Sequence, residues 1–157
     1  MIAWSGRSRL VAHFLNPALI AAVISLSAAE YRRIRAEPMP WVFIFLAAPL
    51  VLHGPTRRAL PRDTRTHLST WIARNQSALA GFAERVTALA PSVREGIRYG
   101  VRSGAFSLAD RSVHSTWAPP RETGQLSDLL SAAAFVGRWF AKIDRPSTAY
   151  ALFGVTP

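Results

Sequence analysis

The stretch Trp41–Leu52 reads WVFIFLAAPLVL and carries no charged side chain. A segment that is apolar on every side has no polar face for water, so it is expected in the core as a buried helix, with a buried strand as the alternative. The run is far shorter than the ~18–20 residues that a transmembrane helix needs, and Pro49 lies inside it. The stretch therefore predicts a core helix and argues against a membrane-spanning protein.

Around this stretch the chain is both apolar and strongly basic. Of 157 residues, 50% are hydrophobic and 18% charged, and 19 Lys+Arg against 9 Asp+Glu give a net charge of +10. So apolar a chain is not a disordered tail, and its length fits a single domain over residues 1–157. A chain with this composition commonly uses part of its surface to bind a partner. Composition alone does not say whether the partner is a protein, a nucleic acid or a membrane. The chain has no cysteine, which excludes disulfides and thiol catalysis.

The N-terminal part, residues 16–62, is predicted to be helical. Asn16 and Pro17 suit the N-cap and the first position of a helix over 17–35, which ends in a cluster of arginines. A basic start before an apolar run also resembles a secretory signal, but the Asn16-Pro17 pair favours a helix start. One more helical turn is expected over 56–60.

Residues 63–117 are predicted to form a winged-helix-like part. Helices are expected from Asp63 or Thr64 to about residue 75, over 77–89, and from Ser92 to Gly104, with Ala90-Pro91 ending the second. Two short alternating segments within 105–117 surround a polar turn and predict a β-hairpin. Two helices, a tight turn and a hairpin give the outline of a winged helix-turn-helix.

A linker over 118–125 leads to C-terminal helices within 126–157. The longer helix, 127–143, is expected to bury Trp139 and Phe140, and a shorter one, 147–153, to end at Gly154. The apolar end of the chain is expected to pack on this domain or on a partner. The predicted fold class is therefore mainly α, a compact helical domain with a winged-helix-like helix-turn-helix plus one small β-hairpin.

No motif for catalysis or cofactor binding occurs. The chain lacks a G-x-x-x-x-G-K loop, a G-x-G-x-x-G turn and a G-x-S-x-G elbow. Its four histidines are scattered, and the pairs Asp63/His67 and Asp110/His114 would each supply only two metal ligands. The sequence therefore predicts a protein that is not an enzyme and holds no cofactor or metal.

The basic residues are the more informative charged groups. Arg94, Arg98 and Arg102 recur at i, i+4 and i+8, one stripe along a helix, and Arg111 lies at the expected tip of the hairpin. These four are candidates for contact with DNA or with an acidic partner, and a solvated helix face is the third alternative. A second basic cluster over residues 56–65 is explained by loop solvation or by anion binding, with solvation favoured.

Four phrases carry a resemblance to a known family. They are Asn16-Pro17-Ala18, the segment Ala48–His53 with Arg57 and Ala59–Pro61 after it, Gly137–Ala141, and Tyr150–Pro157. Together they resemble the middle component of three-component ABC-ATPase systems (ABC-3C), and the likeness runs from about Asn16 to Pro157. The chain departs from the pattern at Thr156, where a basic residue is expected, which weakens a role for charge at that end.

The resemblance implies a non-enzymatic bridging or adaptor subunit. In that setting the protein would link an SMC-like ABC ATPase to an effector, often a nuclease, in a cytoplasmic, Lamassu-like anti-phage defence complex with no membrane component. It also implies structural or interface roles for the residues of the shared phrases, which are Asn16, Pro17, Pro49, His53, Arg57, Gly137, Arg138, Trp139 and Gly154. Apolar surface over 41–52, over 126–140 and at Leu152-Phe153 is expected to contact the partners.

Two other functions remain open from the residues alone. A free-standing winged-helix DNA-binding regulator would use the arginine stripe on its recognition helix. A membrane-surface protein would use the first helix and the arginines at its end.

Overall fold

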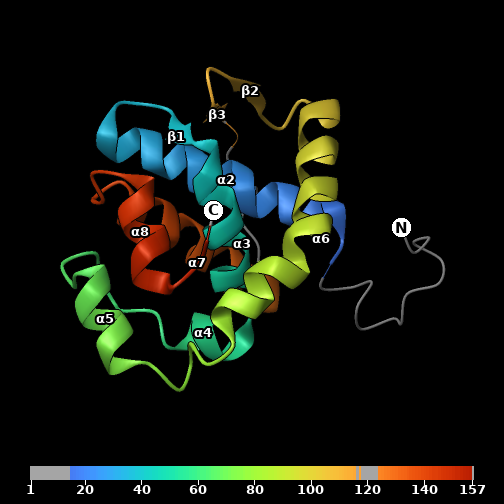
Figure 1. The fold of residues 1–157 in the computed structure, drawn as a ribbon. Helices are drawn as coiled ribbons and strands as arrows, with labels where there is room; N and C mark the ends of the chain where they lie inside the picture. The colour runs from blue at the N-terminus through green and yellow to red at the C-terminus, as the bar shows by residue number, and fades with distance from the viewer. Residues whose placement is uncertain (1–14, 116, 118–123, 157) are drawn as a thin grey trace.

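A computed structural model of the chain describes residues 15–115, 117 and 124–156. Figure 1 shows helices packed around a central helix, with a small sheet at one edge. The basic segment that resembles a secretory signal begins before residue 15, and most of the predicted linker, residues 118–123, also falls outside the described residues. The predicted class, mainly α with a small β element, is confirmed.

The first predicted helix is confirmed as α2, Pro17–Arg35. Asn16 Oδ1 accepts a hydrogen bond from Ala18 N at 2.8 Å, and Pro17 takes the first helical position, where a missing N–H leaves no intrahelical bond unmade. At the other end Arg35 Nη1 donates to the carbonyls of Ala141 and Ile143, both at 3.2 Å. The helix is therefore capped locally and anchored to the C-terminal part of the chain.

The apolar stretch forms a short 3₁₀ helix, η2 (Trp41–Phe43), followed by α3 (Ile44–Leu52). The buried helix is confirmed, and the strand alternative is not what forms. All of α3 except Phe45 is buried, Pro49 included. α3 packs against α2, α6 and α7, which surround it in Figure 1. A helix enclosed in this way has no face to give to water, which is why its sequence shows no polar periodicity.

α2 packs along α7, Gln125–Phe140. A side chain at Gly137 would collide with the backbone of Ser27, so only glycine permits this approach. Ser27 Oγ donates to Ala133 O across the same contact at 2.8 Å. α7 ends at Phe140, three residues before the predicted end, and α8 (Pro146–Phe153) follows, as predicted.

Two short helices connect α3 to the longest helix. α4 (Gly54–Arg58) begins two residues earlier than predicted, because His53 caps it through a bond from Thr56 N to Nδ1. α5 (Leu68–Arg74) begins later than predicted. Asp63 accepts a bond from Arg65 N at 2.9 Å, so its carboxylate closes a local turn instead of capping a helix.

The predicted break at Ala90-Pro91 is wrong. α6 (Phe82–Ser103) runs through Pro91 as one helix and bends in its middle in Figure 1. Proline removes one helical hydrogen bond and kinks the helix, but Val86 before it and Val93 after it are both buried, so core packing holds both halves. The helix starts at Phe82, not residue 77, because Gly81 has a left-handed backbone with φ 71°. The turn of the predicted helix-turn-helix is therefore not formed here, and the winged-helix detail is not confirmed.

The predicted hairpin is present as β2 (Ser107–Ala109) and β3 (Ser112–His114). Asp110 and Arg111 join the strands with φ 51° and 59°, as expected for a two-residue turn that follows the twist of the strands. A third strand, β1 (Met39–Pro40), was not predicted from the sequence. It pairs antiparallel with β3, which gives a three-stranded sheet with the strand order β1-β3-β2. The hairpin is thus tied to the segment just before η2.

The buried core draws on all three predicted parts of the chain. One cluster combines residues of α2 and α3 with Trp71, Val93 and the C-terminal aromatic side chains. Phe43 stacks on Phe140 with ring centroids 4.8 Å apart, and Trp71 meets Trp139 edge to face at 5.2 Å. The C-terminal segment that was expected to pack on this domain or a partner packs here, since Phe153 and Val155 are both buried.

Candidate functional site

A groove of about 750 Å³ runs between η2, α6, the hairpin and the C-terminal segment, and we call it the α6 groove. Its first wall is the start of the apolar stretch, Trp41, Val42 and Phe45. The Trp41 and Phe45 rings meet edge to face at 5.9 Å, and Trp41 is 38% exposed. Trp41 N donates to Arg111 O at 3.0 Å, which fixes the hairpin turn beside this wall.

The opposite wall is the bent region of α6. Val86, Ala90, Pro91 and Ile97 give it an apolar surface, and Leu108 of β2, 43% exposed, lies at its edge. Thr87 adds a hydroxyl to this wall, and Pro91 has no N–H to donate, so the apolar character comes from the side chains of the other lining residues. Two large apolar side chains, Trp41 and Leu108, are therefore exposed at the same concave site.

The C-terminal segment closes the groove. Tyr150 Oη donates to Val42 O at 2.6 Å, so its polar atom is used inside the protein while the side chain lines the groove. Burial raises the pKa of the Tyr150 phenol, so the group stays protonated as a donor at neutral pH. Gly154 takes φ 68° at the end of α8, which turns the chain back and lets Val155 N bond to Tyr150 O at 3.0 Å.

The predicted arginine stripe is exposed along α6, as the spacing indicated. Arg94 and Arg98 line the groove, whereas Arg102 lies one turn farther along and does not. Arg111 is exposed at the hairpin turn. Within the part of the chain that the structure describes, none of these four arginines forms an ion pair, and the residues that line the groove include no carboxylate. The groove is thus apolar inside with a positive rim.

The other predicted partner surface is mostly interior, which corrects that expectation. Most side chains of 41–52 and 126–140 are buried, because they build the protein's own core, whereas residues 126–128 at the start of α7 are not buried. Trp41, Leu126 and Leu152 stay 37–38% exposed, while Phe153 is buried against Phe82. Only separate large apolar side chains of these segments therefore remain exposed, and one of them, Trp41, lines the α6 groove.

The residues of the family phrases act in folding the chain. Asn16 and Pro17 start α2, His53 caps α4, and Gly154 ends α8. Arg57 Nη1 donates to Val51 O at 2.7 Å, which satisfies a carbonyl at the end of α3. Burial is the main reason why the pKa of His53 is lowered, with the nearby arginines adding to it.

The phrase around Gly137 ties α7 to its neighbours. Gly137 allows the close approach to Ser27, and Trp139 Nε1 donates to Thr66 O at 2.8 Å. Arg138 Nη1 pairs with Glu30 Oε2 of α2 at 3.1 Å. Hydrogen bonds from Arg33 first, and then from Arg138, lower the pKa of Glu30. This phrase is therefore a structural signature of the α2–α7 contact.

The second basic cluster is mostly accounted for by internal bonds and solvent. Arg57 is used on the Val51 carbonyl, and Arg65 pairs with Asp63 at 2.8 Å. Arg58 and Arg62 are exposed. This arrangement favours the solvation alternative over a site for an anion.

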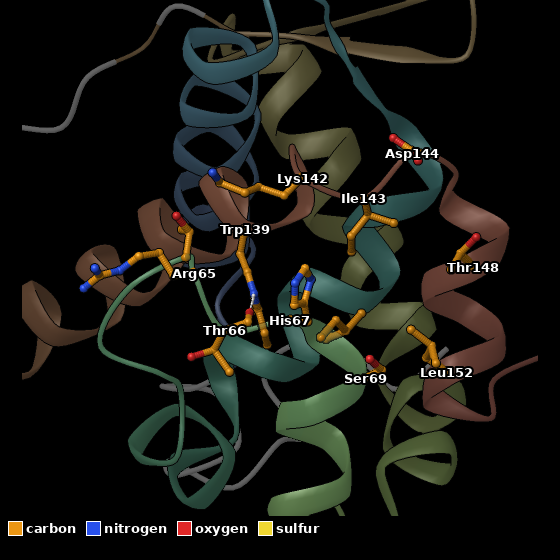
Figure 2. A pocket seen from close by; sticks show the side chains of 12 residues that line it. Arg65, Thr66, His67, Ser69, Trp139, Lys142, Ile143, Asp144, Thr148 and Leu152 are labelled. Atoms are coloured by element: carbon orange, nitrogen blue, oxygen red, sulfur yellow. Dashed lines mark hydrogen bonds between the residues drawn. The ribbon is translucent and has the colours of Figure 1, made fainter.

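A second cavity, of about 510 Å³, lies between α5, the end of α7 and α8 (Figure 2). Figure 2 shows Arg65 pointing away from His67, Ser69 and Leu152, in keeping with its pair with Asp63. The lining carries both a lysine, Lys142, and an aspartate, so it shows no preference for one sign of ligand charge. Among the described residues no group of three or more His, Asp or Glu side chains could hold a metal ion.

Sequence reasoning missed the groove and two glycine contacts of α6. A side chain at Gly96 would collide with Ile20, and one at Gly100 with the Phe106 ring. In the sequence these glycines only weaken a helix, whereas in the fold they let α2 and the hairpin approach α6. The one available signal was their spacing of four, which places both on one helix face.

The chain folds into a mainly helical protein with an apolar groove, and no helix in the described part of the chain is long and apolar enough to cross a bilayer. The chain belongs to the family described as ABC-three component (ABC-3C) system Middle Component 3 (MC3), which matches residues 4–157. This confirms the resemblance seen in the four phrases, and it implies association with the other components of such a system. No curated protein and no solved structure matches the chain.

Proposed function

We propose that this protein is a non-enzymatic adaptor that links an SMC-like ABC ATPase to an effector, often a nuclease, in a cytoplasmic anti-phage defence complex. The observation that carries the proposal is the family match over residues 4–157, because it makes the chain the middle component of a multi-component system. The α6 groove supports it, since an apolar site with a positive rim suits binding and brings no nucleophile and base together.

The test is reconstitution of the complex from its three components. With the ATPase tagged, the effector should be recovered when this protein is present and should be lost when it is omitted. Recovery of the effector in equal amount without this protein would refute the bridging role. A matched control is an adaptor carrying Lys142→Ala, an exposed position outside the α6 groove, which should retain the effector as the native chain does.

A free-standing DNA-binding regulator is the second candidate. The exposed stripe of Arg94, Arg98 and Arg102 on α6 supports this candidate. The predicted helix-turn-helix does not support it, because α6 is one continuous helix. It predicts duplex binding that weakens steeply with salt and collapses when all three arginines become alanine. Duplex affinity that is indifferent to these changes in a filter-binding assay would remove it.

A membrane-surface role has less support. The apolar face of α2 is in the core, with Ile20, Val23 and Ile24 buried, so it is not available to enter a lipid surface. Sedimentation with anionic liposomes would test it, and the adaptor proposal expects the protein to stay in the supernatant.

A further inference from the structure

We propose that the α6 groove binds an acidic amphipathic helix from another component of the system, with apolar side chains in the groove and carboxylates on Arg94 and Arg98. This inference rests on the adaptor function proposed above and names the chemistry of one of its contacts.

The apolar part of the occupant follows from the walls. Trp41 and Leu108 line the groove and are 38% and 43% exposed, and Tyr150 has its hydroxyl engaged with Val42 O. The walls therefore offer hydrocarbon and aromatic surface with few groups that would hydrogen-bond a polar ligand. A tryptophan at the edge of a concave apolar site is the kind of residue that dominates protein–protein binding energy.

The acidic part follows from the rim. Arg94 and Arg98 are one helical turn apart, about 6 Å along the axis, and neither is paired with a carboxylate within the described residues. Guanidinium groups bind carboxylates in a two-pronged manner. Carboxylates one turn apart on a partner helix would match this spacing, and the +10 charge of the chain would attract such a segment.

Protein fits this site better than nucleic acid. Phosphates would satisfy the two arginines but leave the surface around Trp41 and Leu108 unfilled, whereas an amphipathic helix covers both. Arg102 continues the stripe beyond the groove, so it serves as an internal control for charge alone.

The experiment measures assembly of this protein with the other two components, using matched variants. Arg94→Glu with Arg98→Glu should weaken binding by about 30-fold or more, and Leu108→Asp by about tenfold. Two controls should change it less than about threefold. Arg62→Glu with Arg102→Glu makes the same change in net charge at exposed positions outside the groove, and Ile34→Asp makes the same apolar-to-acidic change at a side chain 45% exposed elsewhere.

A photo-reactive amino acid at position 108 then identifies the occupant. The expected product is a cross-link to a segment of another component that carries apolar residues and two carboxylates one turn apart. Replacing those carboxylates by lysine should restore binding to the Arg94→Glu, Arg98→Glu variant. Circular dichroism of each variant checks that the fold is retained.

The outcomes separate this inference from the adaptor function. If the complex assembles and the groove variants bind like the native protein, the inference fails and the adaptor function stands. A cross-link to nucleic acid, to a second copy of this chain, or to a segment without carboxylates also overturns it. If the native protein joins neither component, the adaptor function itself fails and the inference with it.

Discussion

Replacing Gly137 by alanine tests the close contact between α7 and α2. Gly137 of α7 faces the backbone of Ser27 in α2, and an added Cβ would overlap the Ser27 carbonyl group and Cα. The obstacle is backbone within a 19-residue helix, so it cannot rotate aside as a flexible side chain does. The substitution therefore forces α2 and α7 apart, although alanine is the better helix former.

The size of the effect is a difference between two opposing contributions. Alanine in place of glycine inside a helix favours folding by about 1 kcal/mol. Overfilling a packed contact opposes it by about 1–3 kcal/mol, and a rigid obstacle places this case at the upper end. We therefore expect a net loss of about 2 kcal/mol in the free energy of unfolding, which for a chain of this size lowers Tm by about 4–8 °C.

The assay is urea unfolding followed by far-ultraviolet circular dichroism. Ser131→Ala is the matched control, because it is exposed on the same helix and tests helix propensity without a clash. It should leave the free energy of unfolding within about 0.5 kcal/mol of the native value. A Gly137→Ala protein as stable as the native one, or more stable, would refute the close α2–α7 contact.

Three further predictions concern single interactions. Hydrogen bonds lower the pKa of Glu30, so the carboxylate stabilises the fold above the ordinary carboxyl pKa, and this stabilisation is lost as pH falls through the lowered value. Glu30→Gln should therefore cost about 1 kcal/mol in the free energy of unfolding at pH 7 and progressively less in acid. Urea unfolding across pH measures this difference. Trp139→Phe removes the donor to Thr66 O and leaves a cavity at a side chain that is 2% exposed, so it should cost about 2–3 kcal/mol. Gly100→Ala pushes the Phe106 ring out of its place, at about 1–3 kcal/mol, and alanine returns about 1 kcal/mol of helix propensity, so the net cost should be about 0–2 kcal/mol.

Each of these has its own control and its own contrary result. For Glu30, the difference in free energy of unfolding between native protein and variant should shrink in acid. A difference that stays constant from neutral to acid pH would contradict a lowered pKa of Glu30. For Trp139, the control substitution is Trp41→Phe. The Trp41 indole is partly exposed, so this change should lower the free energy of unfolding less. For Gly100, an unchanged rate of amide exchange in the hairpin would show that the Phe106 contact does not hold it.

Part of the fold was predictable because the responsible forces are local. The N-cap at Asn16, the apolar run of α3 and the left-handed glycine after α8 each act within a few residues, and each formed as expected. Element ends were less predictable where a local cap competes with a turn, as at Asp63, whose carboxylate bonds to Arg65.

Of the candidate site, only the positively charged residues could be predicted from the sequence. The spacing of Arg94 and Arg98 placed both on one face of a helix, and that face is exposed. The apolar half of the groove comes from Trp41, Leu108 and Tyr150, which are far apart in the chain. No periodicity within one segment can report that three distant segments meet.

The sequence by itself determined the helical class, the mostly buried helix within residues 41–52, the arginine stripe and the family, because these follow from composition, period and short phrases. Only the tertiary structure decided that α6 continues through Pro91. A proline disfavours an isolated helix, but burial of Val86 and Val93 on either side outweighs that preference. The same packing turned Gly96, Gly100 and Gly137 from weak helix residues into points of close contact, and shaped the α6 groove between segments that the sequence keeps apart.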